Sequence, residues 1–298
     1  MITDEILRKK RECSAVILAH NYQVSPVQDI ADIVGDSLEL SRAAARTAAD
    51  VIIFCGVDFM AETSAILSPE KKVVLPAGEA SCPMAHMITA EQVRDARDLY
   101  PEADVVCYVN STAEVKAESD ICCTSANAVK VVNSLDMKQV LFVPDRNLAS
   151  YVARFTDKRI IPWDGYCYVH DRYTPEQILE AKKLHPKAEV LVHPECRPEV
   201  IDRADYVYST SGMGKHAKGS EADEFIIGTE TGMLYRLRKE NSRKKFYPLS
   251  EDAVCQNMKK TDLTKVLNAL ETLEIRITVS EDIAVRARKA IEKMLQVV

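Results

Sequence analysis

The sequence predicts an α/β fold of three repeated α/β/α units, whose short parallel sheets are arranged about a pseudo-threefold axis. Two observations indicate this architecture. Apolar strands of four to six residues alternate with helical patterns, which is typical of parallel sheets covered on both faces. The same landmarks also recur three times in one order, as in a repeat protein. We place the units at residues 1–83, 84–168 and 169–256, and expect the tail 257–298 (a helix, a strand and a terminal helix) to pack on the first unit.

The first two strands of each unit end in polar side chains. The opening strands "AVILAHN", "DVVCYVNST" and "AEVLVHPE" place three of them at matching points: His20, Asn110 and His193. The second strands "ADIVGDS", "SDICCTS" and "ADYVYST" each end in a hydroxyl: Ser37, Ser125 and Thr210. Each hydroxyl precedes a helical segment, so it is either an N-cap or part of a helix N-terminus that attracts anions. Three converging N-termini would favour a small polyanionic substrate.

The later strands of each unit lead to a cysteine. The third strands "DVIIFCGVDF", "QVLFVPDRN" and "EFIIGTETG" continue into helical patterns. The fourth strands each begin with cationic residues, contain a proline and end at Cys82, Cys167 and Cys255, which are 85 and 88 residues apart. Ligands of open parallel sheets bind outside the carboxyl ends of the strands. Three units about one axis would therefore bring one polar group, one hydroxyl and one thiol each to a common centre.

Three converging thiolates indicate a metal centre with an open position. They suit either a 4Fe-4S cluster with one iron that no protein ligand holds, or a zinc ion with a free site. The chain has no CxxC, so a small zinc finger and a ferredoxin are excluded. The other six cysteines do not recur at matching points, and we interpret them as core or supporting residues: Cys13, Cys55, Cys107, Cys122, Cys123 and Cys196.

Composition excludes several functional classes. The net charge of −6 gives no basic surface for DNA or RNA. No apolar run approaches the roughly 20 residues that span a bilayer, and the N-terminus "MITDEILRKKRE" opens a charged helix and not a signal peptide. The odd number of cysteines, mostly with apolar neighbours, indicates reduced thiols. We therefore expect a cytoplasmic protein that binds neither nucleic acid nor membrane.

Ionisable side chains beside the strand ends complete the candidate site. They are His20 and Tyr22 in "HNY", Tyr108 and Asn110 in "CYVNST", and His193 and Glu195 in "VHPEC". Four other histidines have weaker claims: His86, His170, His185 and His216. The glycine-rich segment 211–220, "SGMGKHAKGS", is interpreted as a mobile, phosphate-contacting lid, although it does not match the P-loop pattern.

Many uncommon short motifs in this order resemble quinolinate synthase. They include "LAHNYQ", "GDSLEL", "GVDFMAET", "YVNSTAE", "PDRNLA", "HPEC" and "STSGM", together with the cysteines of "SCPM", "YCYVH" and "AVCQNM", and the likeness runs from about residue 15 to 262. The resemblance implies three α/β domains and a 4Fe-4S cluster on Cys82, Cys167 and Cys255. It implies a carbon–carbon bond-forming transferase in NAD biosynthesis, which condenses iminoaspartate with dihydroxyacetone phosphate to quinolinate and releases phosphate and two waters.

The resemblance also implies roles for the site residues. Glu195 would be the principal proton-transfer group, with Tyr22, Tyr108 and His193 in orienting or acid–base roles. The remaining polar groups would bind substrate: His20, Ser37, Asn110, Ser125 and Thr210. The open iron would act as a Lewis acid, and a separate oxidase or dehydrogenase would supply iminoaspartate. Some bacterial members carry a C-terminal CxxCxxC that this chain lacks, so thiol–disulfide regulation is not implied.

Two other functions use the same residues. A zinc lyase could bind its metal through the three thiolates, and it would be colourless and active without iron. A non-catalytic iron–sulfur protein for electron transfer or sensing would not need a pocket rich in histidine, tyrosine and glutamate. Metal analysis separates the first alternative from the cluster enzyme, and replacement of Glu195 separates the second.

Overall fold

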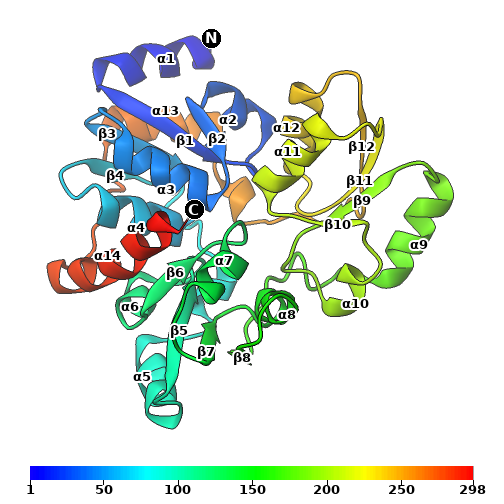
Figure 1. Ribbon diagram of the computed structural model, residues 1–298. Coiled ribbons are helices and arrows are strands. Elements are labelled where there is room, and N and C mark those ends of the chain that lie inside the picture. Colours follow the sequence, from blue (N-terminus) through cyan, green and yellow to red (C-terminus); the bar gives the residue numbers. More distant parts are fainter. Residues whose placement is uncertain (298) are drawn as a thin grey trace.

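The computed structural model describes residues 1–297 and contains three four-stranded parallel sheets flanked by helices (Figure 1). The elements of the first sheet region are α1 (Ile2–Glu12), β1 (Ala15–His20), α2 (Ser25–Ile30), β2 (Ile33–Gly35), α3 (Ser37–Arg46), β3 (Val51–Cys55), α4 (Asp58–Leu67) and β4 (Lys72–Val74). Those of the second are the 3₁₀ helix η1 (Pro83–His86), α5 (Ala90–Leu99), β5 (Ala103–Tyr108), α6 (Ala113–Ala117), β6 (Ile121–Cys123), α7 (Ala128–Asn133), β7 (Gln139–Val143), α8 (Arg146–Ala153) and β8 (Arg159–Pro162).

The third sheet region and the tail complete the chain. Their elements are α9 (Pro175–Leu184), β9 (Glu189–Val192), α10 (Pro198–Ile201), β10 (Tyr206–Val207), α11 (Thr210–Gly219), β11 (Glu224–Gly228), α12 (Met233–Glu240), β12 (Lys245–Pro248), the 3₁₀ helix η2 (Met258–Lys260), α13 (Leu263–Thr272) and α14 (Glu281–Gln296). None of the helices in residues 1–297 has the length and apolar character needed to cross a bilayer.

The strand order is the same in all three sheets. The sheets run β2-β1-β3-β4, β6-β5-β7-β8 and β10-β9-β11-β12, so the first strand of each set lies between the second and the third. All the pairs are parallel. The predicted fold class, three repeated α/β units with short parallel sheets, is therefore confirmed. The exact unit boundaries stay a prediction.

The same hydrogen bond occurs at the matching position of all three sheets. In each sheet, an aspartate carboxylate just before the second strand accepts a backbone N–H from the first strand at 2.8 Å. The three pairs are Ile17 with Asp32, Val105 with Asp120, and Val190 with Asp205. Partners are 15 residues apart in every case. An ionised acceptor strengthens such a bond, so this contact fixes the second strand beside the first in all three sheets.

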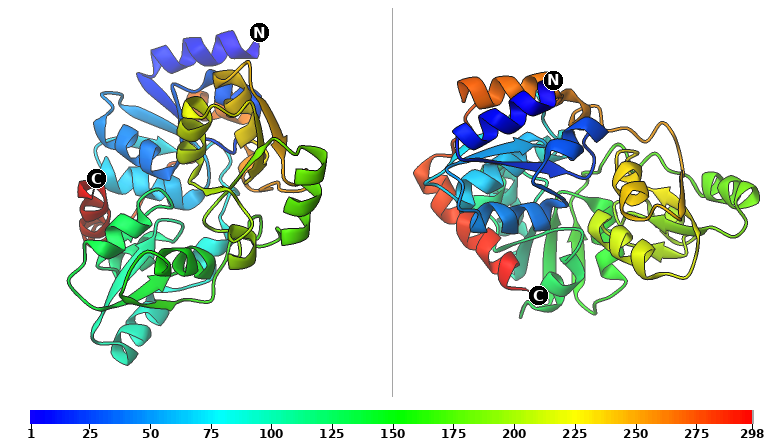
Figure 2. Two further views of the ribbon diagram at one scale, coloured as in Figure 1. Left: turned by 45° about the vertical axis from the view of Figure 1, so that its right-hand side comes forward. Right: turned by 90° about the horizontal axis from the view of Figure 1, so that it is seen from above.

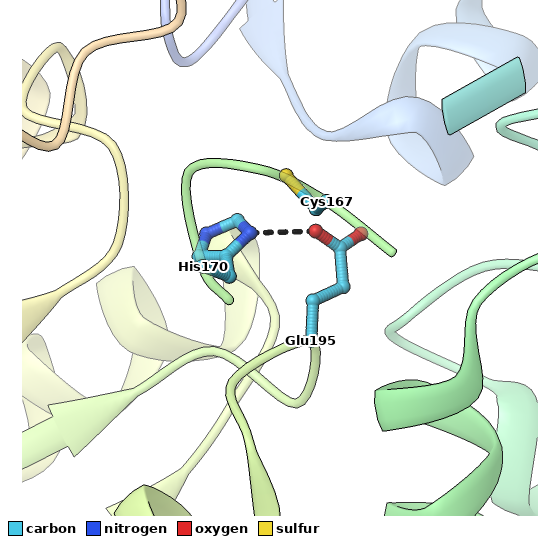
Figure 3. Close-up of side chains that lie close together, drawn as sticks. All are labelled: Cys167, His170 and Glu195. Carbon is cyan, nitrogen blue, oxygen red and sulfur yellow. Dashed lines mark hydrogen bonds and ion pairs between the residues drawn. The ribbon is translucent and has the colours of Figure 1, made fainter. Parts of the chain in front are cut away.

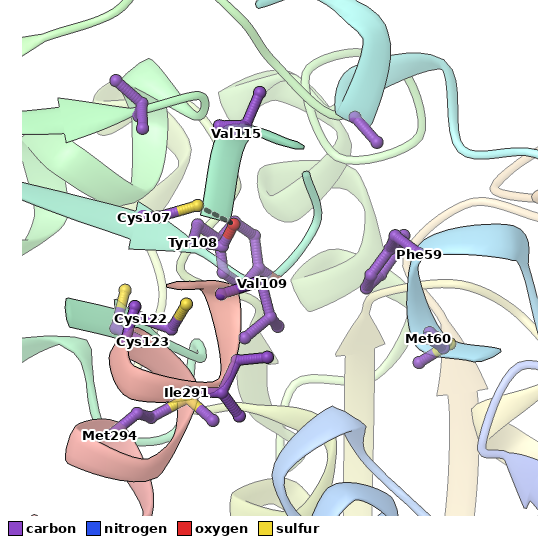
Figure 4. Close-up of a cluster of buried hydrophobic side chains, with 14 of the residues drawn as sticks. Phe59, Met60, Cys107, Tyr108, Val109, Val115, Cys122, Cys123, Ile291 and Met294 are labelled. Atoms are coloured by element: carbon purple, nitrogen blue, oxygen red, sulfur yellow. Dashed lines mark hydrogen bonds between the residues drawn. The ribbon is translucent and has the colours of Figure 1, made fainter. Parts of the chain in front are cut away.

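The core is continuous across the first two sheets. The second sheet and one face of the first belong to one cluster that also includes α14, where Ile291 and Met294 lie with Cys122 and Cys123 of β6 (Figure 4). The other face of the first sheet forms a separate cluster with α1, α2 and α13. The third sheet has two clusters of its own, one on each face. Because parallel strands are buried on both faces, they are nearly all apolar, and β3 is buried at every position.

The tail contacts both of the first two sheet regions. Helix α13 packs against α1, whereas α14 packs mainly against α6 and β6 (Figure 2). In place of the expected tail strand, Arg276 forms an isolated antiparallel bridge to Val74 at the edge of the first sheet. The tail thus joins the first sheet region to the second.

Candidate functional site

A small, partly open cavity lies where the carboxyl ends of the three sheets meet. Its volume is about 70 Å³. All the residues singled out from the sequence line it: Cys82, Cys167, Cys255, Glu195, Tyr22, Tyr108, His193, His20, Ser37, Asn110, Ser125 and Thr210. The convergence expected from the repeat is therefore present, while the chemical role of each residue stays a prediction.

The hydroxyls reach the cavity because neighbouring residues cap the helices. Asp36 caps α3 by accepting the Leu38 and Glu39 N–H groups at 3.0 and 2.9 Å. The N-cap of α11 is likewise Ser209. Ser37 and Thr210 are the first helical residues, so the N-cap interpretation of these two hydroxyls is wrong.

The segment 211–220 is mostly helical and not a loop. It forms most of α11, with Ser209 accepting the Gly212 N–H at 3.3 Å at the start. Met213 and Ala217 are fully buried one turn apart, so the segment has an apolar face that packs as a helix despite its glycines. Lys215 and Lys218 are exposed and do not line the cavity. The segment is therefore a helix and not the expected loop, while its mobility stays a prediction.

The three thiols are held in an environment that opposes ionisation without a cation. Burial raises the pKa of Cys82, Cys167 and Cys255. Their mutual proximity acts in the same direction, because Cys255 raises the pKa of Cys82, and both raise that of Cys167. Thiolates are the metal-binding form, so a positively charged centre among them would remove this repulsion.

The spacing of the donor atoms distinguishes two kinds of metal centre. Among residues 1–297, the one group of three ligand atoms within 4.8 Å of one another is Cys167, His170 and Glu195 (Figure 3). This group could hold a single metal ion, although its histidine and glutamate already hydrogen-bond each other. The three cysteine sulfurs do not form such a group. Zinc–sulfur bonds of about 2.3 Å in a tetrahedron need thiolates roughly 4 Å apart, and the three sulfurs are not all that close to one another in this structure.

A chain of hydrogen bonds crosses the cavity wall from Tyr22 to Glu195. The Tyr22 hydroxyl lies 2.6 Å from Thr229 Oγ1, which lies 2.9 Å from His170 Nε2. His170 Nδ1 lies 2.6 Å from Glu195 Oε2. With a neutral His170, the Tyr22 hydroxyl donates to Thr229, Thr229 donates to His170 Nε2, and the N–H at His170 Nδ1 donates to the Glu195 carboxylate. The chain links the Tyr22 phenol to the buried carboxylate of Glu195 through two hydrogen-bonding side chains, as a proton path requires.

Tyr108 and His193 complete the surroundings of Glu195. The Tyr108 hydroxyl donates to Glu195 Oε1. His193 stacks on His170 with ring centroids 4.5 Å apart. Burial acts against the charge of Glu195, but His193, His170 and the bonds that Glu195 accepts lower the pKa of its carboxyl to about 2. Burial and then the charge of Glu195 raise the pKa of Tyr108, so the glutamate is an acceptor and the phenol a donor at neutral pH.

His170 and Thr229 are functional candidates that sequence reasoning missed. The sequence pattern favours the histidines at strand ends over His170, yet His170 is buried, lines the cavity and bonds Glu195. Its position three residues after Cys167 was the available signal. Thr229 directly follows β11, so the carboxyl-end rule applied to third strands would have found it.

The cavity offers polar groups but no cationic side chain in its lining. Asn110 Oδ1 is buried and has no hydrogen-bond partner within residues 1–297. Buried polar atoms are rarely left unpaired, so an orphaned acceptor in a cavity indicates a missing donor. Any anion would have to be held by hydroxyls and by the N–H groups at the starts of α3 and α11.

His20 gives a testable pH dependence. Burial lowers the pKa of His20 from 6.5 to about 3, and its Nδ1 accepts the Tyr22 N–H at 3.2 Å, which requires the neutral ring. Because the folded pKa is the lower one, stability is complete above pH 6.5 and is lost as the pH falls toward 3. Between about pH 7.5 and 5.5, the free energy of unfolding should fall by on the order of 1 kcal/mol through this group.

His20→Asn removes the titrating ring and retains an acceptor near the position of Nδ1. Its free energy of unfolding, measured by chemical denaturation, should depend less steeply on pH over this interval than that of the unmodified chain. Equal slopes for the two proteins would refute the assignment.

The similarity to known proteins extends over all the residues that line the cavity. The family model described as "Quinolinate synthetase A protein" matches residues 4–296. A quinolinate synthase from Methanoregula boonei is 62% identical to this chain, over 99% of this chain and 98% of its own length. One from Dehalococcoides mccartyi is 58% identical, over 100% and 98%. One from Pyrococcus horikoshii is 54% identical, over 99% and 98%.

Proposed function

The chain belongs to the quinolinate synthase family, which is a family of enzymes, and we propose that it condenses iminoaspartate with dihydroxyacetone phosphate to form quinolinate. The reaction releases phosphate and two waters and supplies a precursor of NAD. One observation carries the proposal: the three recurrent cysteines and the recurrent polar groups line a single cavity. A separate oxidase or dehydrogenase provides iminoaspartate, and the nine free cysteines fit a cytoplasmic location.

The proposed cofactor is a 4Fe-4S cluster held by Cys82, Cys167 and Cys255. The fit rests on three half-buried thiols that line one cavity, and on sulfurs that are not all within 4.8 Å of one another, which favours a centre larger than one zinc ion. When bound, the cluster supplies a Lewis-acidic iron that no protein side chain ligates. The cavity lining contains no lysine or arginine, and its carboxylates are Asp36 and Glu195.

Substrate anions are held by neutral donors. Ser37 and Thr210 stand at the first positions of α3 and α11, where backbone N–H groups and the helix dipole favour negative charge. Ser125 and His20 line the same cavity. Asn110 offers its unpaired Oδ1 to a substrate O–H or N–H. These groups orient carboxylates or phosphate without forming a tight ion pair.

The proton-transfer groups are already in complementary states. Each loss of water requires a base to remove a proton and an acid to protonate the departing hydroxyl. Glu195 is ionised and accepts hydrogen bonds from Tyr108 and His170. Tyr22 and Tyr108 keep their protons, because burial raises the pKa of both. Glu195 is therefore the proposed base, and the tyrosines are the proposed acids, with His193 orienting the carboxylate.

The experiment that tests this function is an anoxic assay of the purified protein. Freshly generated iminoaspartate and dihydroxyacetone phosphate should yield quinolinate and one phosphate per turnover, and the protein should be brown. Omission of either substrate is the control. A colourless zinc protein with full activity would favour the zinc lyase, and an iron–sulfur protein that forms no quinolinate would favour a non-catalytic role.

A further inference from the structure

We propose that three carboxylates, Asp58, Asp145 and Glu230, form a collar that positions the cysteine backbones for cluster binding. Each stands just after the third strand of its sheet, and each lies beside the segment that carries the cysteine of the same sheet. This inference rests on the proposed function, because it concerns retention of the proposed cluster. The collar residues are positioning residues, since they act through the cysteine backbones.

Asp58 holds the first cysteine through two contacts. Its Oδ1 accepts the Cys82 N–H at 3.1 Å and the Phe59 N–H at 2.8 Å. Its own N–H donates to the carbonyl of Ala80, two residues before the cysteine, at 2.9 Å. The backbone on either side of this position is thus tied to the start of α4. The Cys82 thiol is left free to face the cavity.

Glu230 repeats this arrangement at the third cysteine. Its Oε1 accepts the Cys255 N–H at 3.1 Å. The next residue, Thr231, donates its N–H to the carbonyl of Ala253, again two residues before the cysteine, at 3.0 Å. Glu230 is fully buried, and Lys259 compensates its charge with a contact of 2.8 Å. A buried carboxylate with this many partners is placed rigidly.

Asp145 takes the same place at the second cysteine. Arg146 N–H donates to the carbonyl of Gly165, two residues before Cys167, at 2.8 Å, and Gly165 N–H returns a bond to Pro144 at 3.0 Å. A Cβ at Gly165 would lie 2.5 Å from the Pro144 oxygen, so the close approach requires glycine. Asp145 is fully buried, and its Oδ2 has no hydrogen-bond partner among residues 1–297. Burial raises the pKa of Asp145 well above its ordinary value, while the nearby Cys167 backbone N–H acts to lower it.

The collar would help a cluster with three protein ligands to bind, because it fixes the backbone next to the cysteines. All three thiolates must be in place together, and side chains on loops are less precisely placed than those on strands. Hydrogen bonds from the Cys82 N–H to Asp58 and from the Cys255 N–H to Glu230 fix the backbone next to two of the three ligands, and the backbone bonds around Gly165 fix it next to the third. Partners that orient metal ligands typically change metal affinity by about 10–100-fold when they are removed.

The test compares Asp58→Ala, Asp58→Asn and Asp32→Ala in the full chain. Asp32 is the matched control, since it also accepts a backbone N–H, from Ile17 at 2.8 Å. It lies before the amino end of β2, whereas Asp58 follows the carboxyl end of β3. After anoxic reconstitution, we measure iron and sulfide content, the rate of cluster loss to a chelator, the spectrum of the reduced cluster in electron paramagnetic resonance, and the melting temperature of the apo-protein.

Asp58→Ala should lose its cluster about 10–100-fold faster and show an altered resonance spectrum. Asp58→Asn keeps an acceptor oxygen and should restore retention. Asp32→Ala should lower the melting temperature without changing the rate of cluster loss. The inference would be overturned if Asp58→Ala lost its cluster no faster than the unmodified chain. It would also be overturned if Asp32→Ala lost its cluster as fast as Asp58→Ala.

If Asp58→Ala does not fold, Glu230→Ala with Asp205→Ala as its control makes the same comparison in the third sheet region, because Asp205 accepts the Val190 N–H at 2.8 Å. An unmodified chain that holds no cluster would overturn the proposed function and the collar together. If the unmodified chain binds the cluster and the collar variants lose it at the same rate as the unmodified chain, the collar alone would be overturned.

Discussion

Replacement of Cys82, Cys167 or Cys255 with alanine is expected to abolish both the bound cluster and quinolinate formation. Each substitution removes one of only three protein ligands, and partners that merely orient ligands already contribute about 10–100-fold, so activity should fall by at least about two orders of magnitude. Iron and sulfide analysis of each variant after anoxic purification, with the quinolinate assay alongside, measures both effects.

Cys13→Ala is the control for these variants. Cys13 is a partly exposed cysteine whose sulfur donates to the Leu270 carbonyl at 3.4 Å, and it does not line the cavity. Its replacement should leave the cluster and turnover nearly intact. Equal losses in all four variants would show that the three cavity cysteines are not a distinct set.

Glu195→Gln is expected to lower kcat by about 10²–10⁴-fold while the cluster remains bound. Glutamine has nearly the same shape, but it cannot accept the proton. Its amide would also present N–H groups to a position where the Tyr108 hydroxyl and His170 Nδ1 both donate. Steady-state kinetics and the cluster absorbance, measured on the same sample, separate loss of chemistry from loss of cofactor.

Glu189→Gln offers a matched control from the same sheet. Glu189 also accepts from a histidine, with 2.7 Å between its Oε2 and His216 Nε2, but it lies at the start of β9 and does not line the cavity. The control should keep nearly full kcat. Normal turnover in Glu195→Gln would exclude Glu195 as the base.

The sequence predicted the strand ends well because their signal is local. Apolar runs stop where a parallel strand leaves the core, so the positions of His20, Asn110 and His193 could be read from the pattern alone. The recurrence of Cys82 and Cys167 in matching places then indicated the convergence that the cavity confirms.

Contacts between different sheet regions could not be predicted in the same way. Tyr22 meets Thr229, and Tyr108 meets Glu195, only because the three regions pack together. His170 acquires its importance from these partners, and its own neighbourhood in the sequence does not show them. The packing of α14 on α6 and β6 depends likewise on a long-range apolar contact.

Glycine content misled the interpretation of residues 211–220. Glycine lowers helix propensity by up to about 1 kcal/mol per residue relative to alanine, and this segment contains three glycines. The cap at Ser209 and the buried face formed by Met213 and Ala217 outweigh that cost. Tertiary burial decided the outcome where local propensity favoured a loop.

The central claim is that thiols from three sheets hold one iron–sulfur centre. Its most direct test is a crystal structure of the anoxically purified protein with anomalous diffraction recorded at the iron edge. We predict one compact iron peak in the cavity, bonded to the sulfurs of Cys82, Cys167 and Cys255 and to no fourth protein ligand. Iron bound elsewhere, or a cavity whose three sulfurs contact no metal, would contradict the account.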